Sequence, residues 1–249
     1  MIRIEHLSKV FRTEEVETTA LNDVSLHVKQ GEFVAIMGPS GCGKSTLLNI
    51  IGLLDNPTSG NYYFNGQEVG HLKEKQRTQV RKGNIGFVFQ SFNLIDELNV
   101  YENVELPLIY LKKKASEKKE LVTSILDRMN ISHRVKHFPQ QLSGGQQQRV
   151  AIARMLMQNT PIKIFDDSLS AVDMETDAKI REAIQHQVTG TTIIIAHRIT
   201  TLMNADCIAV MDKGRVVQLG THEQLLQKDG IYRRIYEAQG LGDGKEESF

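Results

Sequence analysis

The chain is poor in the features that mark secreted and membrane-spanning proteins. It has two cysteines, Cys42 and Cys207, far apart in the sequence. Two are too few for a disulfide framework and are typical of a protein in a reducing compartment. No run of about 18 apolar residues occurs, so we expect no membrane-spanning segment. Residues 1–5 alternate polar and apolar side chains, which indicates a strand and not a signal peptide.

Net charge is also lacking, because 30 basic residues balance 30 acidic ones. A nucleic-acid partner therefore gains no support from the overall charge, although local patches remain possible. What the chain does have is length and apolar content. Its 249 residues are 40% apolar, which suits one large domain, or one domain with an inserted lobe, around a real core.

The most informative stretch is a glycine-rich turn between an apolar strand and a helix. Residues 33–37 (FVAIM) predict a buried strand, residues 47–51 (LLNII) predict a helix, and residues 38–46 between them read GPSGCGKST. This is the pattern G-x-x-x-x-G-K-[ST] in the context that it needs. Its glycines allow positive φ angles and a close approach to a ligand, and the amides at a helix N-terminus favour an anion. A glycine turn with a surface lysine is the alternative, which the flanking strand and helix disfavour.

We therefore expect nucleotide phosphates to bind to this loop, which we call the phosphate loop. Lys44 would reach the β- and γ-phosphates, and the Ser45 hydroxyl would ligate Mg²⁺. Cys42 is either a small filler residue or a thiol through which a reagent would block nucleotide binding, and we favour the first interpretation. The nucleotide-binding residues predicted here are Gly38, Ser40, Gly41, Cys42, Gly43, Lys44, Ser45 and Thr46.

The rest of the chain predicts an α/β fold with two additions. Strands at 2–7 and 20–28, separated by a polar loop through Thr19, indicate an antiparallel β layer. Residues 91–155 indicate an inserted helical lobe, in which Ser116 would cap one helix. Its lysine-rich segment 112–120 is a solvated helix face or, as a weaker alternative, a membrane or nucleic-acid contact. Other expected elements are strands at 61–66, 85–89, 162–166 and 191–196, helices at 71–82, 150–157, 175–188 and 231–239, hairpin turns at 65–66 and 213–214, and a helix capped at Thr221.

Three further strands end in polar residues that suit phosphate chemistry. Gln90 follows one strand, Asp166 and Asp167 follow a second, and His197 follows a third. Ligands of open α/β sheets bind at the carboxyl ends of the strands, so we expect these side chains near the phosphate loop. Asp166 would hold Mg²⁺ through a water, Asp167 would orient or deprotonate the attacking water, and Gln90 and His197 would contact the γ-phosphate side.

A second glycine turn precedes a helix about a hundred residues after the phosphate loop. It reads LSGGQ over residues 142–146 and is a second place where an anion is favoured. One chain can hardly bring both turns to one phosphate. A head-to-tail pair of chains could, with this turn closing over the partner's nucleotide.

Together these motifs, in this order, resemble the nucleotide-binding subunit of ATP-binding cassette (ABC) transporters, over residues 1–239. The resemblance rests on the Walker A loop at 38–46, the Q-loop residue Gln90, the signature turn at 142–146, the Walker B strand at 162–166, the D-loop at 170–173 and the switch residue His197. It implies that Phe11 stacks on adenine, that two subunits sandwich two ATP molecules, and that closure drives a membrane partner.

The same resemblance assigns the remaining roles. Nucleotide contacts from the partner chain would come from Ser143, Gly144, Gly145 and Gln146. Mg²⁺ would be held by Ser45, Gln90 and Asp166, and hydrolysis would depend on Asp167, His197, Gln90 and Lys44. The α/β core and β subdomain would comprise residues 1–90 and 156–239, the helical subdomain 91–155, and a flexible tail 240–249.

Two departures from the family pattern matter. The family usually has Glu where Asp167 stands; Asp is shorter by about 1.5 Å, and a misplacement of about 1 Å costs roughly 100-fold in rate. We therefore predict slow hydrolysis. Moreover, residues 85–94 and 102–108 resemble stand-alone ATPases of macrolide, lipoprotein and peptide export, whereas the part from about residue 161 resembles ATPase domains fused to exporters. A natural or engineered mosaic joined near residues 154–161 is our hypothesis for this difference.

Three functions remain in contention on the sequence alone. The leading one is a cytoplasmic ATPase, peripheral on the inner face of the cell membrane, that forms a homodimer or heterodimer and powers export through a separate transmembrane subunit. The second is an ATP-dependent dimer clamp that hydrolyses little, which Asp167 would favour. The third is a soluble ABC protein acting on ribosomes or DNA, which the neutral charge and the absence of paired cassettes or long insertions disfavour.

Overall fold

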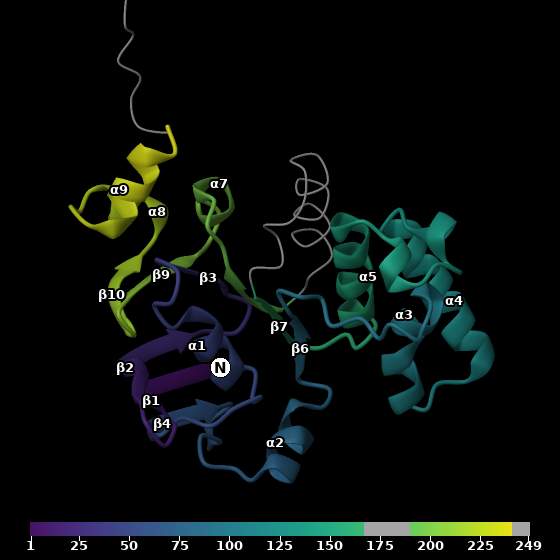
Figure 1. Ribbon diagram of the computed structural model, residues 1–249, viewed down its shortest axis with the longest axis horizontal. Helices are drawn as coiled ribbons and strands as arrows, with labels where there is room; N and C mark the ends of the chain where they lie inside the picture. The colour runs from purple at the N-terminus through teal and green to yellow at the C-terminus, as the bar shows by residue number, and fades with distance from the viewer. Residues whose placement is uncertain (167–189, 241–249) are drawn as a thin grey trace, which may run out of the picture. The chain divides into compact units, whose positions relative to one another are not determined.

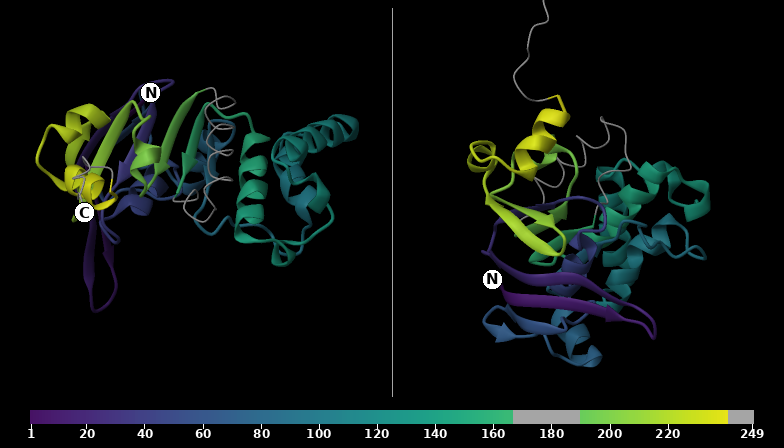
Figure 2. Two further views of the ribbon diagram at one scale, coloured as in Figure 1. Left: turned by 90° about the horizontal axis from the view of Figure 1, so that it is seen from above. Right: turned by 60° about the vertical axis from the view of Figure 1, so that its left-hand side comes forward.

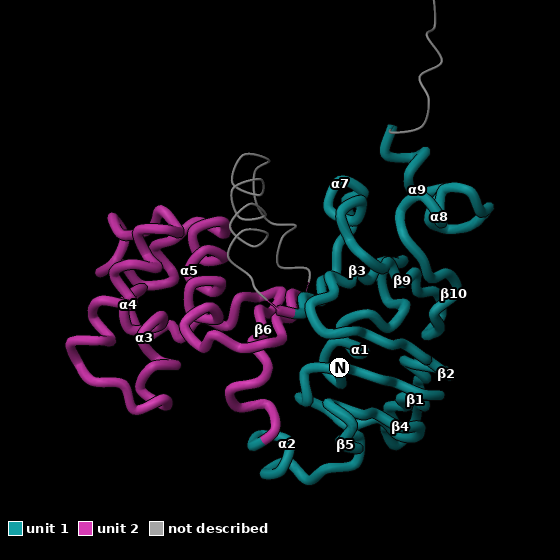
Figure 3. Tube along the Cα trace, turned by 180° about the vertical axis from the view of Figure 1, so that it is seen from behind, with its two compact units in different colours: residues 1–79, 191–249 teal, residues 80–190 magenta. Residues whose placement is uncertain are grey.

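The computed structural model describes residues 1–166 and 190–240, and its described residues divide into two compact units (Figure 3). Unit 1 comprises residues 1–79 and 191–249, and unit 2 comprises residues 80–190. The predicted helical subdomain, 91–155, lies within the range of unit 2; its exact bounds stay a prediction. The helix expected at 175–188 and the tail from residue 241 lie outside the described residues.

Unit 1 contains an antiparallel sheet whose strand order is β2-β1-β4-β5. The bounds are β1 (Ile2–Arg12), β2 (Glu17–Val28), β4 (Ser59–Phe64) and β5 (Gln67–Glu68). Alternate residues of β1, such as Ile2 and Ile4, are buried, as the alternating sequence predicts. Asn65 and Gly66 both have positive φ (49° and 82°), which is the geometry of the expected two-residue hairpin turn between β4 and β5.

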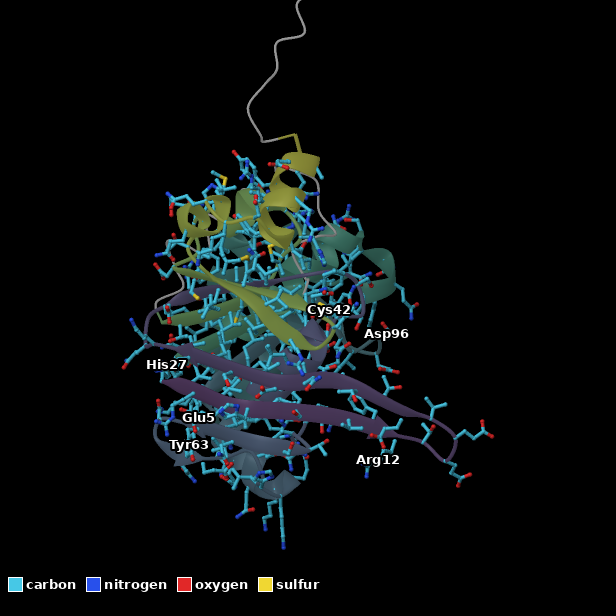
Figure 4. The ribbon with its side chains drawn as sticks, turned by 90° about the vertical axis from the view of Figure 1, so that its left-hand side faces the viewer. Glu5, Arg12, His27, Cys42, Tyr63 and Asp96 are labelled. Atoms are coloured by element: carbon cyan, nitrogen blue, oxygen red, sulfur yellow. The ribbon has the colours of Figure 1, made fainter. Side chains whose placement is uncertain are left out.

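The prediction of a polar loop up to Thr19 is wrong. β1 continues through Phe11 to Arg12, and β2 begins again at Glu17, so only residues 13–16 form the turn. Strand pairing here, including the ion pair between Arg12 Nε and Glu17 Oε2 at 2.8 Å, outweighs the polar composition. The result is a long two-stranded ribbon, whose outer end carries Arg12 and extends beyond the strands behind it, such as β4 with its Tyr63 (Figures 2 and 4).

A second sheet of unit 1 has the strand order β10-β9-β3-β8. Here β3 (Phe33–Met37) runs parallel to both β8 (Thr191–Ile195) and β9 (Cys207–Asp212), and β10 (Arg215–Gly220) is antiparallel to β9. β8 is buried along its whole length and β3 from Val34 onward, as their continuous apolar sequences predict. Lys213 and Gly214, with φ of 45° and 77°, form the expected hairpin turn between β9 and β10.

Most helices of unit 1 follow the predicted pattern with small shifts at their ends, whereas the short helix Ile199–Leu202 was not predicted. α1 (Lys44–Ile51) leaves the phosphate loop and buries four apolar residues, and α2 (Glu74–Arg81) buries none. α7 is Ile199–Leu202, α8 is His222–Leu226 and α9 is Ile231–Ala238. Thr221 caps α8 in a capping box with Gln224, as its sequence predicts. Figure 1 shows α8 and α9 following β10 at the C-terminal end of the unit.

Unit 2 pairs β6 (Ile85–Val88) in parallel with β7 (Ile162–Phe165), and the chain between them is mostly helical. The helices are α3 (Val100–Tyr110), α4 (Ala115–Arg128) and α5 (Gly144–Leu156), with short 3-10 helices η1 (Ser132–Arg134) and η2 (Pro139–Gln141). Parallel strands, an antiparallel sheet and a helical part confirm the α/β fold class. Pro107 lies inside α3, where the sequence alone gave no helix boundary.

Two predicted helix starts in unit 2 are wrong. α4 begins one residue before Ser116, with Lys114 at the cap position, so Ser116 lies in the first turn and is not the cap. α5 begins at Gly144 and not at residue 150, because Ser143 caps it and Gln146 completes a capping box. The glycine pair that suggested a turn is therefore the first turn of the helix. This places the signature turn directly at a helix N-terminus.

Candidate functional site: a phosphate loop and two strand edges

The phosphate loop of unit 1 has the expected strand–loop–helix geometry. β3 ends at Met37, and α1 begins at Lys44 without a side-chain cap. Gly38, Gly41 and Gly43 have φ of 148°, 75° and 85°, which L side chains rarely adopt. A Cβ on Gly43 would lie 2.1 Å from the Ala20 carbonyl oxygen, so this glycine is required for close packing as well as for its φ.

The Lys44 side chain bends back to the first residues of this loop. Its ammonium donates to the carbonyl oxygens of Gly38 and Pro39, at 3.0 Å each. Ser45, the next residue, is exposed, and Ser40 and Gly41 earlier in the loop are exposed as well. A cation, a hydroxyl and a helix N-terminus thus gather at one solvent-accessible place, which is the arrangement that binds phosphate groups.

Cys42 is the buried side chain of the loop and is 5% exposed. Burial raises the pKa of its thiol, the nearby Lys44 ammonium lowers it by less, and Asp212 raises it further. A buried thiol with a raised pKa is a poor nucleophile. This supports the small-filler interpretation of Cys42.

His197 lies at the same sheet edge as the phosphate loop. β8 runs parallel to β3 with Ile195 beside Ile36, and the Ala196 amide donates to the Ile36 carbonyl at 3.2 Å. His197 is the next residue and is exposed. Its backbone carbonyl accepts a hydrogen bond from Gln239 Nε2 at 2.7 Å. The structure therefore brings His197 and the phosphate loop together at the carboxyl ends of adjacent strands, as expected.

Phe11 belongs to the same unit and is 45% exposed on β1. It pairs with Thr18 on β2, two residues before Ala20, whose carbonyl oxygen lies against Gly43. Two residues of a strand span about 7 Å. The ring is therefore carried by the ribbon that supports the phosphate loop.

Unit 2 brings Gln90 and Asp166 together at a second strand edge. β6 and β7 are parallel with Val88 beside Phe165, and the Asp166 amide donates to the Val88 carbonyl at 2.9 Å. Asp166 is 7% exposed, whereas Gln90, two residues beyond β6, is exposed. Carboxylate, amide and hydroxyl oxygens are hard ligands of the kind that Mg²⁺ prefers. Asp167 and the D-loop lie outside the described residues.

The signature turn lies at the N-terminus of α5. Ser143 Oγ accepts from the Gln146 amide at 3.4 Å, and Gln146 Oε1 accepts from the Ser143 amide at 3.0 Å. Ser143 and Gly144 are exposed, and a Cβ added to Gly144 would meet nothing within 4 Å. The turn thus offers an open surface at a helix N-terminus, where a negative group is favoured.

Three supporting residues were not predicted from the sequence. Arg154 holds the backbone that follows Gln90, Lys9 contacts Phe11, and Gly214 packs beside Ala20 under the phosphate loop. Each contact joins residues that are far apart in the sequence or depends on a strand register. The Lys9–Phe11 contact was missed because the strand was expected to end before residue 9, and of the three residues only Gly214 had a sequence signal, its hairpin turn.

Two features are absent from the described parts of the chain. No helix there is long and apolar enough to cross a membrane. Nor does any group of three or more His, Cys, Asp or Glu side chains in residues 1–166 and 190–240 form a cluster that could hold a metal ion. Mg²⁺ in nucleotide sites commonly uses one or two protein ligands together with phosphate oxygens.

Comparison with known proteins places these motifs in a family context. The residue pattern of the family described as "ABC transporter" matches residues 21–170. The macrolide export ATP-binding/permease protein MacB of Brucella melitensis is 37% identical over 244 residues, which cover 97% of this chain and 38% of that protein. The chain therefore spans well under half the length of these curated MacB relatives.

Shorter relatives match along almost their whole length. The uncharacterized ABC transporter ATP-binding protein MJ0796 of Methanocaldococcus jannaschii is 42% identical over 223 residues, covering 87% of this chain and 95% of that protein. The solved dimeric structure of MJ0796 bound to ADP and Pi superposes with a TM-score of 0.84 at 39% identity, covering 89% of this chain and 98% of that one.

The comparisons give no support to the mosaic hypothesis. The MacB match covers 97% of this chain and so continues through residues 154–161, where the junction was placed. One relative thus aligns with the sequence on both sides of that point. The local features that suggested two sources are compatible with a single continuous sequence of this family.

Proposed function

This chain belongs to the ABC transporter family, and we propose that it binds ATP with Mg²⁺, hydrolyses it and, as a dimer, powers export through a membrane partner. The observation that carries the proposal is the phosphate loop, with Lys44 held by two loop carbonyls at 3.0 Å beside the N-terminus of α1. Membership of the family supports the general role, that of an ATPase that drives a transporter. The dimer, the partner and the individual residue roles are the proposed part.

Nucleotide binding would use both ends of the ATP molecule. The amides of the phosphate loop and Lys44 would bind the phosphates, with Lys44 leaving the Gly38 and Pro39 carbonyls for the β- and γ-phosphates. Phe11 would stack on adenine. Mg²⁺ would be held by Ser45, Gln90 and Asp166 and would neutralise charge that develops on the phosphate oxygens.

Hydrolysis would require a positioned water. Its oxygen attacks the γ-phosphorus, the bond to the bridging oxygen of ADP breaks, and the water's proton passes to a base, for which we propose Asp167. Gln90 and His197 would orient the γ-phosphate and the water. Because the Asp167 carboxylate is one methylene shorter than the usual glutamate, we propose slow turnover.

Dimerisation would complete the site. Ser143, Gly144, Gly145 and Gln146 at the exposed N-terminus of α5 would contact the nucleotide of the other chain. The dimeric structures of the relative MJ0796, one of them bound to ADP and Pi, support a dimer; the contact of these residues with the other chain's nucleotide is the proposed part. A homodimer and a heterodimer are both compatible with it, and a head-to-tail pairing of this kind places one phosphate loop opposite each signature turn.

The partner would be a transmembrane transporter subunit, with this chain on the cytoplasmic face of the membrane. Support comes from the MacB relatives, which are named as ATP-binding and permease proteins and of which this chain matches 38%. The two other functions have less support. MacB and MJ0796 are named as export and transporter proteins, which favours neither a hydrolysis-deficient clamp nor a protein of ribosomes or DNA.

The test is ATP hydrolysis by the purified chain with Mg²⁺ as a function of protein concentration. We expect a low rate that rises faster than linearly with concentration, because the active species is a dimer. Lys44→Ala should abolish it, and Asp167→Glu should raise it. A rate that is linear in concentration would contradict the dimer, and Asp167→Glu without a gain would contradict the role of Asp167.

A matched binding measurement separates the enzyme from the clamp. Wild type and Asp167→Glu should bind ATP equally, since the change lies in the hydrolytic position. If wild type binds ATP but shows no turnover in a single-turnover experiment, while Asp167→Glu hydrolyses it, the clamp replaces the enzyme. Failure of wild type to bind ATP would contradict both.

A further inference from the structure

The ammonium group of Lys9, on β1, is held by two neighbouring residues, Asp55 and Asn56. It forms an ion pair with Asp55 Oδ2 at 2.7 Å and donates to the Asn56 carbonyl oxygen, also at 2.7 Å. The Lys9 side chain is 13% exposed and that of Asp55 38%. These two interactions restrict the Lys9 side chain to a defined position, whereas most surface lysines are mobile.

The same ammonium lies 5.0 Å from the centroid of the Phe11 ring. Residues 9 and 11 are two apart on one strand, so their side chains share a face. A lysine has three N–H donors, and Asp55 and Asn56 accept hydrogen bonds from the ammonium. The charge therefore stays against one face of the ring, within the range of a cation–π interaction.

These contacts connect the ring to the phosphate loop and to the helix that follows it. Asp55 and Asn56 follow α1, the helix that leaves the loop. Phe11 itself lies on the ribbon whose Ala20 carbonyl packs against Gly43. Lys9 thus links the strand that carries the ring to the turn after the phosphate-binding helix, within unit 1.

We propose that Lys9 is a positioning residue that holds Phe11 as a preformed stacking platform for the nucleotide base. The proposal rests on the proposed function, in which Phe11 stacks on adenine. One ring face is against the Lys9 charge, and the base occupies the other, which accounts for a phenylalanine that is 45% exposed. A ring already in place loses little conformational freedom on binding, so Lys9 increases affinity for the base and leaves affinity for the phosphates unchanged.

The experiment compares two ligands that differ in the base. Dissociation constants for Mg-ATP and for Mg-tripolyphosphate, which has no base, are measured by calorimetry. Lys9→Met keeps an unbranched side chain, shorter by the charged nitrogen, and should weaken ATP binding about two- to fivefold. Its affinity for tripolyphosphate should equal that of wild type. Lys9→Arg, which keeps a cation at the ring, should restore most of the ATP affinity.

Phe11→Ala separates this proposal from the function on which it rests. It should weaken ATP binding by about tenfold or more, and adding Lys9→Met to it should cause no further loss. If Phe11→Ala leaves ATP affinity unchanged, the stacking role of Phe11 is wrong and the Lys9 proposal fails with it. ATP binding by the phosphate loop is tested separately, by the loss of ATP affinity expected in Lys44→Ala.

Other outcomes overturn the Lys9 proposal alone. They are an unchanged ATP affinity in Lys9→Met, an equal loss for both ligands, or the same loss in the Phe11→Ala background. Equal losses would mean that Lys9 only supports the fold, through Asp55. Lys29→Met, at an exposed position after β2, is the matched control and should bind both ligands like wild type.

Discussion

Arg154 holds the carbonyl of Phe92 in place, with 2.8 Å between its Nη2 and that oxygen, and its Nη1 holds the next carbonyl, of Asn93, at 2.7 Å. Phe92 and Asn93 both have positive φ, 61° and 46°, which is unusual for two consecutive residues that are not glycine. They follow Gln90 closely, and Arg154 lies near the end of α5, whose first turn carries the signature. One helix therefore supports two candidate functional segments.

Arg154→Ala should destabilise the protein by roughly 1–3 kcal/mol, because it removes charge-assisted hydrogen bonds to the backbone carbonyls of two residues with positive φ. Burial lowers the pKa of the guanidinium, yet an arginine stays protonated, so the bonds are present at any working pH. Denaturant titration measures the loss. Arg128→Ala, at the exposed end of α4, is the control, and an equal loss there would contradict a specific role for Arg154.

Gly43→Ala should impair both folding and nucleotide binding. The new Cβ would lie 2.1 Å from the Ala20 carbonyl oxygen at a φ of 85°, so strain and overlap add to roughly 2–5 kcal/mol. Gly41→Ala is a matched control, since its φ is similar at 75° but nothing lies within 4 Å of its Cβ. Thermal unfolding and ATP binding should both show the larger effect at Gly43, and comparable effects would be evidence against the packing argument.

Ser143→Ala should lower stability and ATP turnover together. It removes a cap from α5, which costs about 1 kcal/mol, and it removes a proposed contact to the partner's nucleotide. Thr221→Ala removes the same kind of capping box from α8, away from the signature turn. We expect Thr221→Ala to lose similar stability with turnover per folded molecule unchanged. Equal turnover in the two variants would contradict the role of Ser143.

Tyr232 should ionise only in strong alkali. Burial, and to a lesser extent the nearby Glu223 and Tyr236, raises the pKa of Tyr232 to about 12, and its hydroxyl lies 2.6 Å from His222 Nδ1. A folded-state pKa above the unfolded value means that this contribution to stability is full below about pH 10 and is lost as pH rises through 12. The difference in absorbance at about 295 nm between wild type and Tyr232→Phe should show this titration. A midpoint near 10 would refute it.

Local sequence signals predicted the elements that depend on local physics. The strand 33–37 and the loop after it, the turns at Asn65–Gly66 and Lys213–Gly214, and the capping box at Thr221 all follow from apolar runs, positive φ or capping geometry. These features need only a few neighbouring residues. The position of His197 beside the phosphate loop depends in addition on the pairing of β3 with β8, which joins distant residues.

Signals that depend on distant residues were missed or misread. Residues 17–19 are polar, yet they form a strand because β1 pairs with them. The helix start at Gly144 is an exception, because its signal, the capping box of Ser143 and Gln146, is local and was overlooked in favour of a glycine turn. Lys9 and Asp55 are 46 residues apart, and Arg154 and Phe92 are 62 apart. Such contacts have no periodicity, so a single sequence carries no local sign of them.

The packing under the phosphate loop determines when this loop can fold while the chain is being synthesised. The Ala20 carbonyl lies against Gly43 and also close to Gly214, whose amide donates to the Cys42 carbonyl at 3.0 Å and whose carbonyl accepts from the Asn22 amide at 2.8 Å. The loop at residues 38–46 therefore reaches its final form only after residue 214 has left the ribosome. ATP would then be a late ligand of the nascent chain, and a fragment that ends before β9 should not bind it.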